Sequence, residues 1–127
     1  MKSLRRRYFF LLWSVGPNYR ALSDTFEKLF GRDELMRAGL RSIIKGTRWS
    51  VVRVWHSHMA QLRVAIATLE GPKAAYTLVA SGTVRGLNRA LKRRRAGQDF
   101  VKEFEELYLR GRRAEFRRRK QRKRTKG

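Results

Sequence analysis

The stretch YFFLLWSV, residues 8–15, is an almost continuous apolar run that decides how the rest of the chain can fold. Three arginines (Arg5, Arg6 and Arg7) precede it, and the pair Gly16-Pro17 follows it. Eight residues suit a strand better than a helix, and the lack of polar alternation indicates a strand buried on both faces. The run is too short to span a membrane and has no small-residue cleavage site, so we expect neither export nor a membrane partner.

After this run the chain alternates between helical and strand patterns. Asn18 and Ser57 are suitable N-caps, because each precedes apolar residues at helical spacing. The expected elements are a strand at 8–15, a helix ending before Gly31, a helical turn from Asp33 through Ala38, strands at 40–45 and 49–56, a helix from Ser57 to Gly71, and a strand at 74–80. This order predicts an α+β fold of the ferredoxin-like, split βαβ type, with an antiparallel sheet and helices on one face.

Further helices are expected beyond this core. Val84, Leu87 and Leu91 form a narrow apolar seam, and a second apolar stripe runs from Phe100 to Tyr108. The second stripe should dock on a protein surface, whereas the sequence beyond Arg110 is almost devoid of apolar residues. We therefore divide the chain into a domain at 1–96 and a C-terminal helix with a basic extension at 97–127.

The charge of the chain is strongly positive and unevenly distributed. Its 127 residues contain 32 Lys and Arg against 10 Asp and Glu, a formal net charge of +22. The segment from Arg110 to Gly127 carries eleven basic residues and one acid, and two further clusters lie at 5–7 and 92–95. Blocks of like charge are costly to hold together without a polyanion, and arginine matches phosphate bidentately, so the pattern predicts a polyanion that carries phosphates as the partner.

The segment Ser81-Gly82-Thr83-Val84-Arg85-Gly86 lies at a strand-to-helix junction. Ser81 or Thr83 could cap the free amide groups of the helix, and Gly82 allows a sharp turn. The same helix N-terminus, with Arg85 one turn away, could bind a phosphate. The spacing of a P-loop is absent, and both interpretations, a cap alone or a cap with a phosphate site, stay open.

The sequence offers no convincing catalytic set. Cysteine is absent, which excludes disulfides, zinc ribbons and cysteine nucleophiles. His56 and His58 form an H-x-H pair without further ligands, and the ten acids do not gather into a Mg²⁺ site. The strand aromatics, namely Tyr8, Trp49, Trp55 and Tyr76, could stack on bases, although burial is the commoner use of such side chains.

Taken together, residues 29–95 resemble the archaeal and eukaryotic ribonuclease P protein component 2. The shared features are a glycine–acid start to the second helix, a basic valine-rich strand, a helix beginning near Ser57 and the V-x-S-G-T-[IV] strand end. Here the last is Val79-Ala80-Ser81-Gly82-Thr83-Val84, which leads into the basic helix Arg85-Gly86-Leu87-Asn88-Arg89. With the first strand included, the likeness covers about residues 4–95. The turn at Gly46-Thr47 is shorter than in that family, and the basic extension is longer.

The resemblance implies an RRM-like accessory subunit of ribonuclease P, in which a catalytic RNA uses Mg²⁺ to remove the 5′ leader of precursor tRNA. It implies no cofactor and no catalytic residue in this chain. It also implies a TIM-barrel protein partner, as a heterotetramer with two copies of each subunit, and a cytoplasmic location, or a nuclear one in a eukaryote. A ribosomal protein, a related ribonuclease P subunit of the same fold and an independent metal-dependent nuclease are the alternatives.

From the charge pattern and the motif we expect the RNA to be contacted by three groups of residues. They are Arg5, Arg6 and Arg7; Ser81, Gly82, Thr83, Arg85, Arg89, Lys92, Arg93, Arg94 and Arg95; and, in the extension, Arg112, Arg113, Arg117, Arg118, Arg119 and Lys120.

Overall fold

The computed structural model describes residues 5–94 and 100–110. Its elements are β1 (Arg6–Trp13), α1 (Tyr19–Phe30), α2 (Arg32–Ala38), β2 (Arg41–Lys45), β3 (Trp49–Trp55), the 3₁₀ turn η1 (His56–His58), α3 (Met59–Thr68), the 3₁₀ turn η2 (Gly71–Lys73), β4 (Ala75–Ser81) and α4 (Val84–Arg94). Residues 100–110 form one more helical segment, here termed the C-terminal helix. The predicted order of strands and helices is confirmed.

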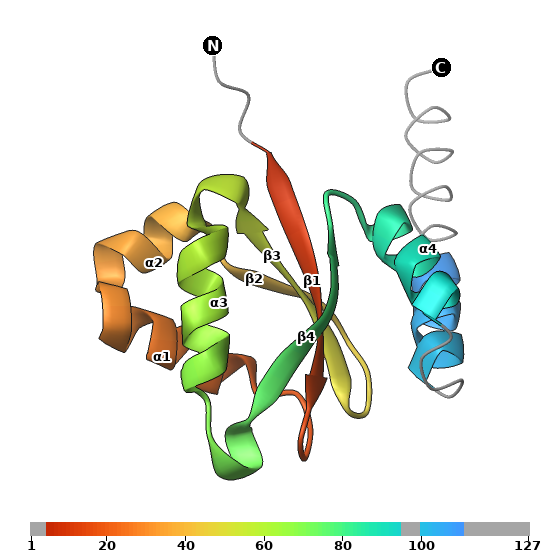
Figure 1. The fold of residues 1–127 in the computed structure, drawn as a ribbon, viewed down its shortest axis with the longest axis horizontal. Coiled ribbons are helices and arrows are strands. Elements are labelled where there is room, and N and C mark those ends of the chain that lie inside the picture. Colours follow the sequence, from red (N-terminus) through yellow and green to blue (C-terminus); the bar gives the residue numbers. More distant parts are fainter. Residues whose placement is uncertain (1–4, 95–99, 111–127) are drawn as a thin grey trace, which may run out of the picture.

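The four strands form one antiparallel sheet in the order β2-β3-β1-β4, as the split βαβ arrangement requires. Helices α1, α2 and α3 cover one face of this sheet, as predicted from the sequence (Figure 1). Helix α4 and the C-terminal helix cover the other face (Figure 1). The result is three layers, with the sheet between two sets of helices.

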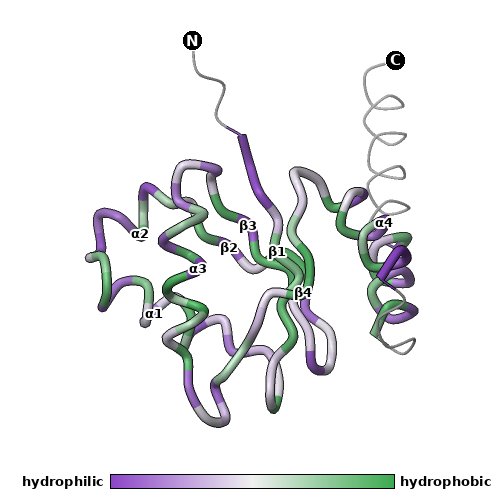
Figure 2. The backbone as a smooth tube through the Cα atoms, viewed as in Figure 1, coloured by the Kyte–Doolittle hydropathy of each residue, from purple (hydrophilic) through white to green (hydrophobic). Residues whose placement is uncertain are grey.

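The first strand is buried on both faces, as its unbroken apolar sequence predicts. Phe9, Leu11 and Trp13 point into a core beneath α1 and α3, here termed the first core. Phe10 points the other way, into a second core beneath α4 and the C-terminal helix. Figure 2 shows the hydrophobic residues gathered in the strands, whereas the start of β1 is hydrophilic. Strand β1 therefore holds the two helical layers together.

Strand β3 is covered on both of its faces. Trp49 and Val51 belong to the second core, and Val52 and Val54 to the first. At the far end of the strand, Arg53 and Trp55 are only partly buried.

Two of the expected caps have different outcomes. The side chain of Asn18 accepts a hydrogen bond from the amide of Ala21 at 3.1 Å, so the predicted cap of α1 is confirmed. Ser57 is not a cap, because the chain makes a 3₁₀ turn after Trp55 and α3 begins only at Met59. The N-cap position of α2 is occupied by Gly31, and Asp33 lies inside the first turn, where its charge favours the helix dipole.

Gly46, in the turn between β2 and β3, lies directly against the indole of Trp49. A Cβ at this position would overlap the Trp49 ring and the carboxylate of Glu103. We predict that Gly46→Ala lowers the free energy of unfolding by about 1–3 kcal/mol, the usual cost of overpacking. Urea denaturation measures it. Gly16→Ala is the matched control, because its added Cβ would meet only Thr47 O at 3.5 Å, and an equal loss in both variants would contradict the prediction.

Candidate nucleic-acid interface

The sheet brings together two of the segments that the sequence singled out for RNA binding. In the pairing of β1 with β4, Tyr8 lies opposite Ser81, so Arg5, Arg6 and Arg7 lie beside the turn that leads into α4. A Cβ added at Gly82 would lie 3.5 Å from Nη1 of Arg7. Figure 1 shows the start of β1 and the link from β4 to α4 at the same end of the sheet. We term this region, residues 5–7 and 81–85, the basic end.

Two arginines of the basic end, Arg6 and Arg7, contact aromatic rings. Nε of Arg7 donates to Nδ1 of His56 at 3.3 Å, and the guanidinium of Arg6 lies 5.2 Å from the ring centroid of Trp55. Arg5 and Arg6 are exposed and Arg7 is partly exposed. Within residues 5–94 and 100–110, none of the three forms an ion pair with an acidic side chain. Their charge is therefore available to an outside anion.

The Ser81-Gly82-Thr83 turn caps α4 through Thr83. Oγ1 of Thr83 accepts a hydrogen bond from the amide of Gly86 at 2.9 Å, and its carbonyl accepts one from Leu87 at 3.1 Å. A Cβ at Gly86 would overlap the hydroxyl of Ser81, so Gly86 allows the turn to close over the helix. Gly82 does not adopt a positive φ. The capping interpretation is confirmed for Thr83, and phosphate binding at this turn stays a prediction.

The basic residues of α4 divide into two groups. Arg85, Arg89 and Arg93 are exposed. Lys92 instead forms an ion pair with Glu105 at 2.9 Å, and Arg94 donates to the carbonyl of Leu78. The last two side chains therefore also fasten α4 to the C-terminal helix and to β4.

The remaining predicted contacts lie outside the described residues. They are Arg95, Arg112, Arg113, Arg117, Arg118, Arg119 and Lys120.

The C-terminal helix closes the face of the sheet on which an RRM-type protein would stack bases. Phe104 is fully buried there, and its ring meets Phe10 at 5.6 Å and Trp49 at 5.5 Å, both edge to face. Glu103 accepts a hydrogen bond from the amide of Thr47 at 2.8 Å and so fixes the helix to the β2–β3 turn. The burial expected for Trp49 is thus confirmed, and the middle of this face does not offer a stacking platform.

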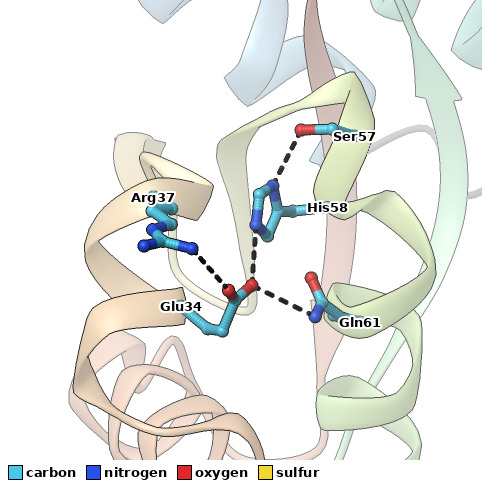
Figure 3. Close-up of polar contacts among 5 residues, drawn as sticks. All are labelled: Glu34, Arg37, Ser57, His58 and Gln61. Atoms are coloured by element: carbon cyan, nitrogen blue, oxygen red, sulfur yellow. Dashed lines mark hydrogen bonds and ion pairs between the residues drawn. The ribbon is translucent and has the colours of Figure 1, made fainter.

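A polar cluster joins α2 to the start of α3 (Figure 3). Nε2 of His58 lies 3.0 Å from Oε2 of Glu34, and the same oxygen accepts a hydrogen bond from Gln61 at 3.4 Å. Arg37 approaches the other carboxylate oxygen at 3.5 Å, and the Ser57 hydroxyl lies 2.8 Å from Nδ1 of His58. Glu34 and His58 are 24 residues apart, so the sequence could not pair them. Within the described residues no cluster of His and acidic side chains could hold a metal ion.

This cluster makes the stability of the protein sensitive to acid. The hydrogen bond from His58, followed by that from Gln61, lowers the pKa of Glu34 below its ordinary value of 4.5. A lowered folded-state pKa stabilises the protein above the unfolded value, and this stabilisation is lost as the pH falls through the folded pKa. We predict that Glu34→Gln loses less stability than the wild type on acidification below pH 4.5. Melting temperatures across this range measure it, and identical acid profiles would refute it.

Comparison with known proteins gives a structural likeness and no sequence relative. No protein-family model matches the chain. No curated protein matches it either. A chain in the cryo-EM structure of yeast Ribonuclease MRP is similar, with a TM-score of 0.55 over 92% of this chain and 98% of that chain. The two sequences are 11% identical, so the likeness shows a shared fold.

In the part of the chain that the structure describes, no helix combines the length and the apolar character that crossing a membrane requires.

Proposed function

We propose that this chain is an RNA-binding protein subunit of a ribonuclease P-type ribonucleoprotein, which supports a catalytic RNA in removing the 5′ leader of precursor tRNA. The observation that carries the proposal is the basic end, where Arg5, Arg6 and Arg7 lie beside the Ser81–Arg85 turn and, as far as the described residues show, pair with no acidic side chain. The fold shared with a chain of yeast Ribonuclease MRP, a ribonucleoprotein related to ribonuclease P, supports the same class of assembly.

The chain would act by neutralising phosphates. The rigid sheet holds Arg5, Arg6 and Arg7 beside the start of α4, so RNA strands could approach one another closely on this surface. Arg85 and Arg89 would extend the contact along α4, and the predicted contacts in the extension would add to it. Such neutralisation lowers the concentration of Mg²⁺ that a folded RNA needs, because protein charges replace bound counterions.

In this proposal the RNA performs the hydrolysis, with Mg²⁺ bound to the RNA. The protein contributes position and charge rather than a catalytic residue. Because of the sequence resemblance, the proposal also includes a TIM-barrel protein partner and an assembly with two copies of each subunit. It places the chain where tRNA matures, in the cytoplasm or, in a eukaryote, in the nucleus.

Reconstitution tests the proposal. Ribonuclease P RNA and its TIM-barrel protein partner are incubated with precursor tRNA at low Mg²⁺, with and without this chain. We expect 5′-leader removal only when the chain is present, and the chain alone should leave the precursor intact. Cleavage independent of the chain would contradict the proposal, and cleavage by the purified chain alone would favour the nuclease alternative.

Affinity purification distinguishes the ribosomal alternative. A tagged chain expressed in its native cells should recover ribonuclease P RNA. Recovery of intact ribosomal subunits in place of that RNA would support a ribosomal protein.

A further inference from the structure

A groove of about 350 Å³ lies at the edge of the sheet, where the end of β3 meets β2 and the helices α1 and α2. The residues that matter for its chemistry are Arg6, Arg41, Arg53, Trp55, Tyr19 and Met36. This volume is within the range of sites that enclose small organic ligands. The groove is separate from the turn that caps α4, although Arg6 belongs to both regions.

Three arginines line the groove. Arg41 and Arg53 are direct partners in the pairing of β2 with β3, an arrangement that brings like charges together at a cost in stability. Arg6 reaches the same groove from β1. Among residues 5–94 and 100–110, no acidic residue lines the groove and none of the three arginines forms an ion pair. An anion bound among them would offset the repulsion.

The half-buried ring of Trp55 lies beside these charges, with the guanidinium of Arg6 5.2 Å from its centroid. The ring packs on the backbone of Gly39, where a Cβ would lie 2.5 Å from the indole Nε1. The φ of 61° at Gly39 also favours glycine, so the backbone is shaped to receive the ring. Trp13 and Trp49 are only 4% and 0% exposed, whereas Trp55 is half-buried and lines the groove.

We propose that this groove binds one unpaired nucleotide of RNA, with the phosphate among Arg6, Arg41 and Arg53 and the base against Trp55. A groove for phosphate alone would need the charges but not the ring. A base has a π-face that an indole accepts whatever the sequence, so the combination suits a single-stranded nucleotide. The inference rests on the proposed RNA-binding function, and it adds a specific site at the opposite edge of the sheet from β4.

The experiment compares two single-stranded RNA octamers with the same backbone, one with bases and one abasic at every position. Binding is followed by fluorescence anisotropy and by the quenching of tryptophan emission; a base can contact Trp55 but not Trp13 or Trp49, because these two side chains are buried. We expect the RNA with bases to bind at least about fivefold more tightly, as stacking allows, and to quench the emission, whereas the abasic RNA should not.

Two variants and a control locate the effect. Trp55→Ala should abolish the preference for bases and leave the affinity for the abasic RNA unchanged. Arg53→Gln, which keeps the Trp55 ring, should weaken the binding of both RNAs. Arg48→Gln removes the same charge from an exposed arginine at the other end of β3, and the preference for bases should persist. Circular dichroism verifies that each variant is folded.

The outcomes separate the groove from the proposed function. Equal binding of the two octamers without quenching would overturn the nucleotide site and leave the RNA-binding function intact. Binding of neither octamer at low salt would contradict the proposed function and the site with it. Displacement of the labelled RNA by inorganic phosphate or a phosphopeptide, as effective as that by unlabelled RNA, would show that the groove is a general anion site. That result would overturn the proposal.

Discussion

Replacing Phe104 with alanine is expected to lower the free energy of unfolding by about 3–5 kcal/mol, the range for truncating a buried phenylalanine. The residue is fully buried in the second core, where its ring contacts Phe10, Trp49 and Tyr108. Its loss would leave a cavity between the sheet and the C-terminal helix and would weaken the attachment of that helix. Chemical denaturation followed by circular dichroism measures the effect.

Leu109→Ala is the control for this variant. Leu109 lies on the same helix but is 43% exposed, so its truncation should cost much less. Comparable losses from Phe104→Ala and Leu109→Ala would show that the C-terminal helix is not integrated into the core. The prediction matters for function, because the same helix covers the face on which RRM-type proteins stack bases.

Replacing Arg7 and Arg85 together by glutamine is expected to weaken RNA binding roughly a hundredfold at low salt. A hydrogen bond to a charged group contributes about 1.5–3 kcal/mol, and each 1.4 kcal/mol corresponds to a factor of ten. The slope of log affinity against log salt should also become shallower by about 0.7 for each lost contact to a single-stranded phosphate. Both quantities come from titrations of RNA at several salt concentrations.

Arg20 and Arg37 provide the matched control. They lie on α1 and α2, and each faces a carboxylate, at 3.9 Å for Asp24 and 3.5 Å for Glu34. Their replacement by glutamine removes the same formal charge from the helical layer, and RNA affinity should change little. If both double variants weaken binding equally, the chain binds RNA through its net charge alone, and the basic end has no special role.

The sequence predicts those parts of the fold that depend on local pattern. The unbroken apolar run from Tyr8 identifies a strand buried on both faces, and Asn18 identifies a helix start, because each signal lies within a few neighbouring residues. The predicted cap at Ser57 is wrong because it also rested on the local sequence alone. A good capping residue is present, but the 3₁₀ turn after Trp55 shifts the start of α3 to Met59.

The parts that sequence could not predict depend on contacts between distant segments. The stripe from Phe100 to Tyr108 shows that a helix must dock, but only the three-dimensional arrangement shows that it docks on Phe10 and Trp49. The partnership of Arg7 with the Gly82 turn depends on strand register, and so does the pairing of Arg41 with Arg53. Register follows from the whole sheet and cannot be read from either strand alone.

The burial of β1 on both faces also constrains how the protein is made. During synthesis this strand is made before its partners β3 and β4, which follow much later in the chain, and before the C-terminal helix, which follows later still. Synthesis adds roughly 5–20 residues per second, so the apolar strand stays without its partner strands for several seconds. An unpaired apolar strand is prone to aggregation. The arginines Arg5, Arg6 and Arg7 directly precede its apolar residues and would repel a second nascent copy. These three charges would thus limit aggregation of the newly made chain, in addition to the RNA contact that we propose for them.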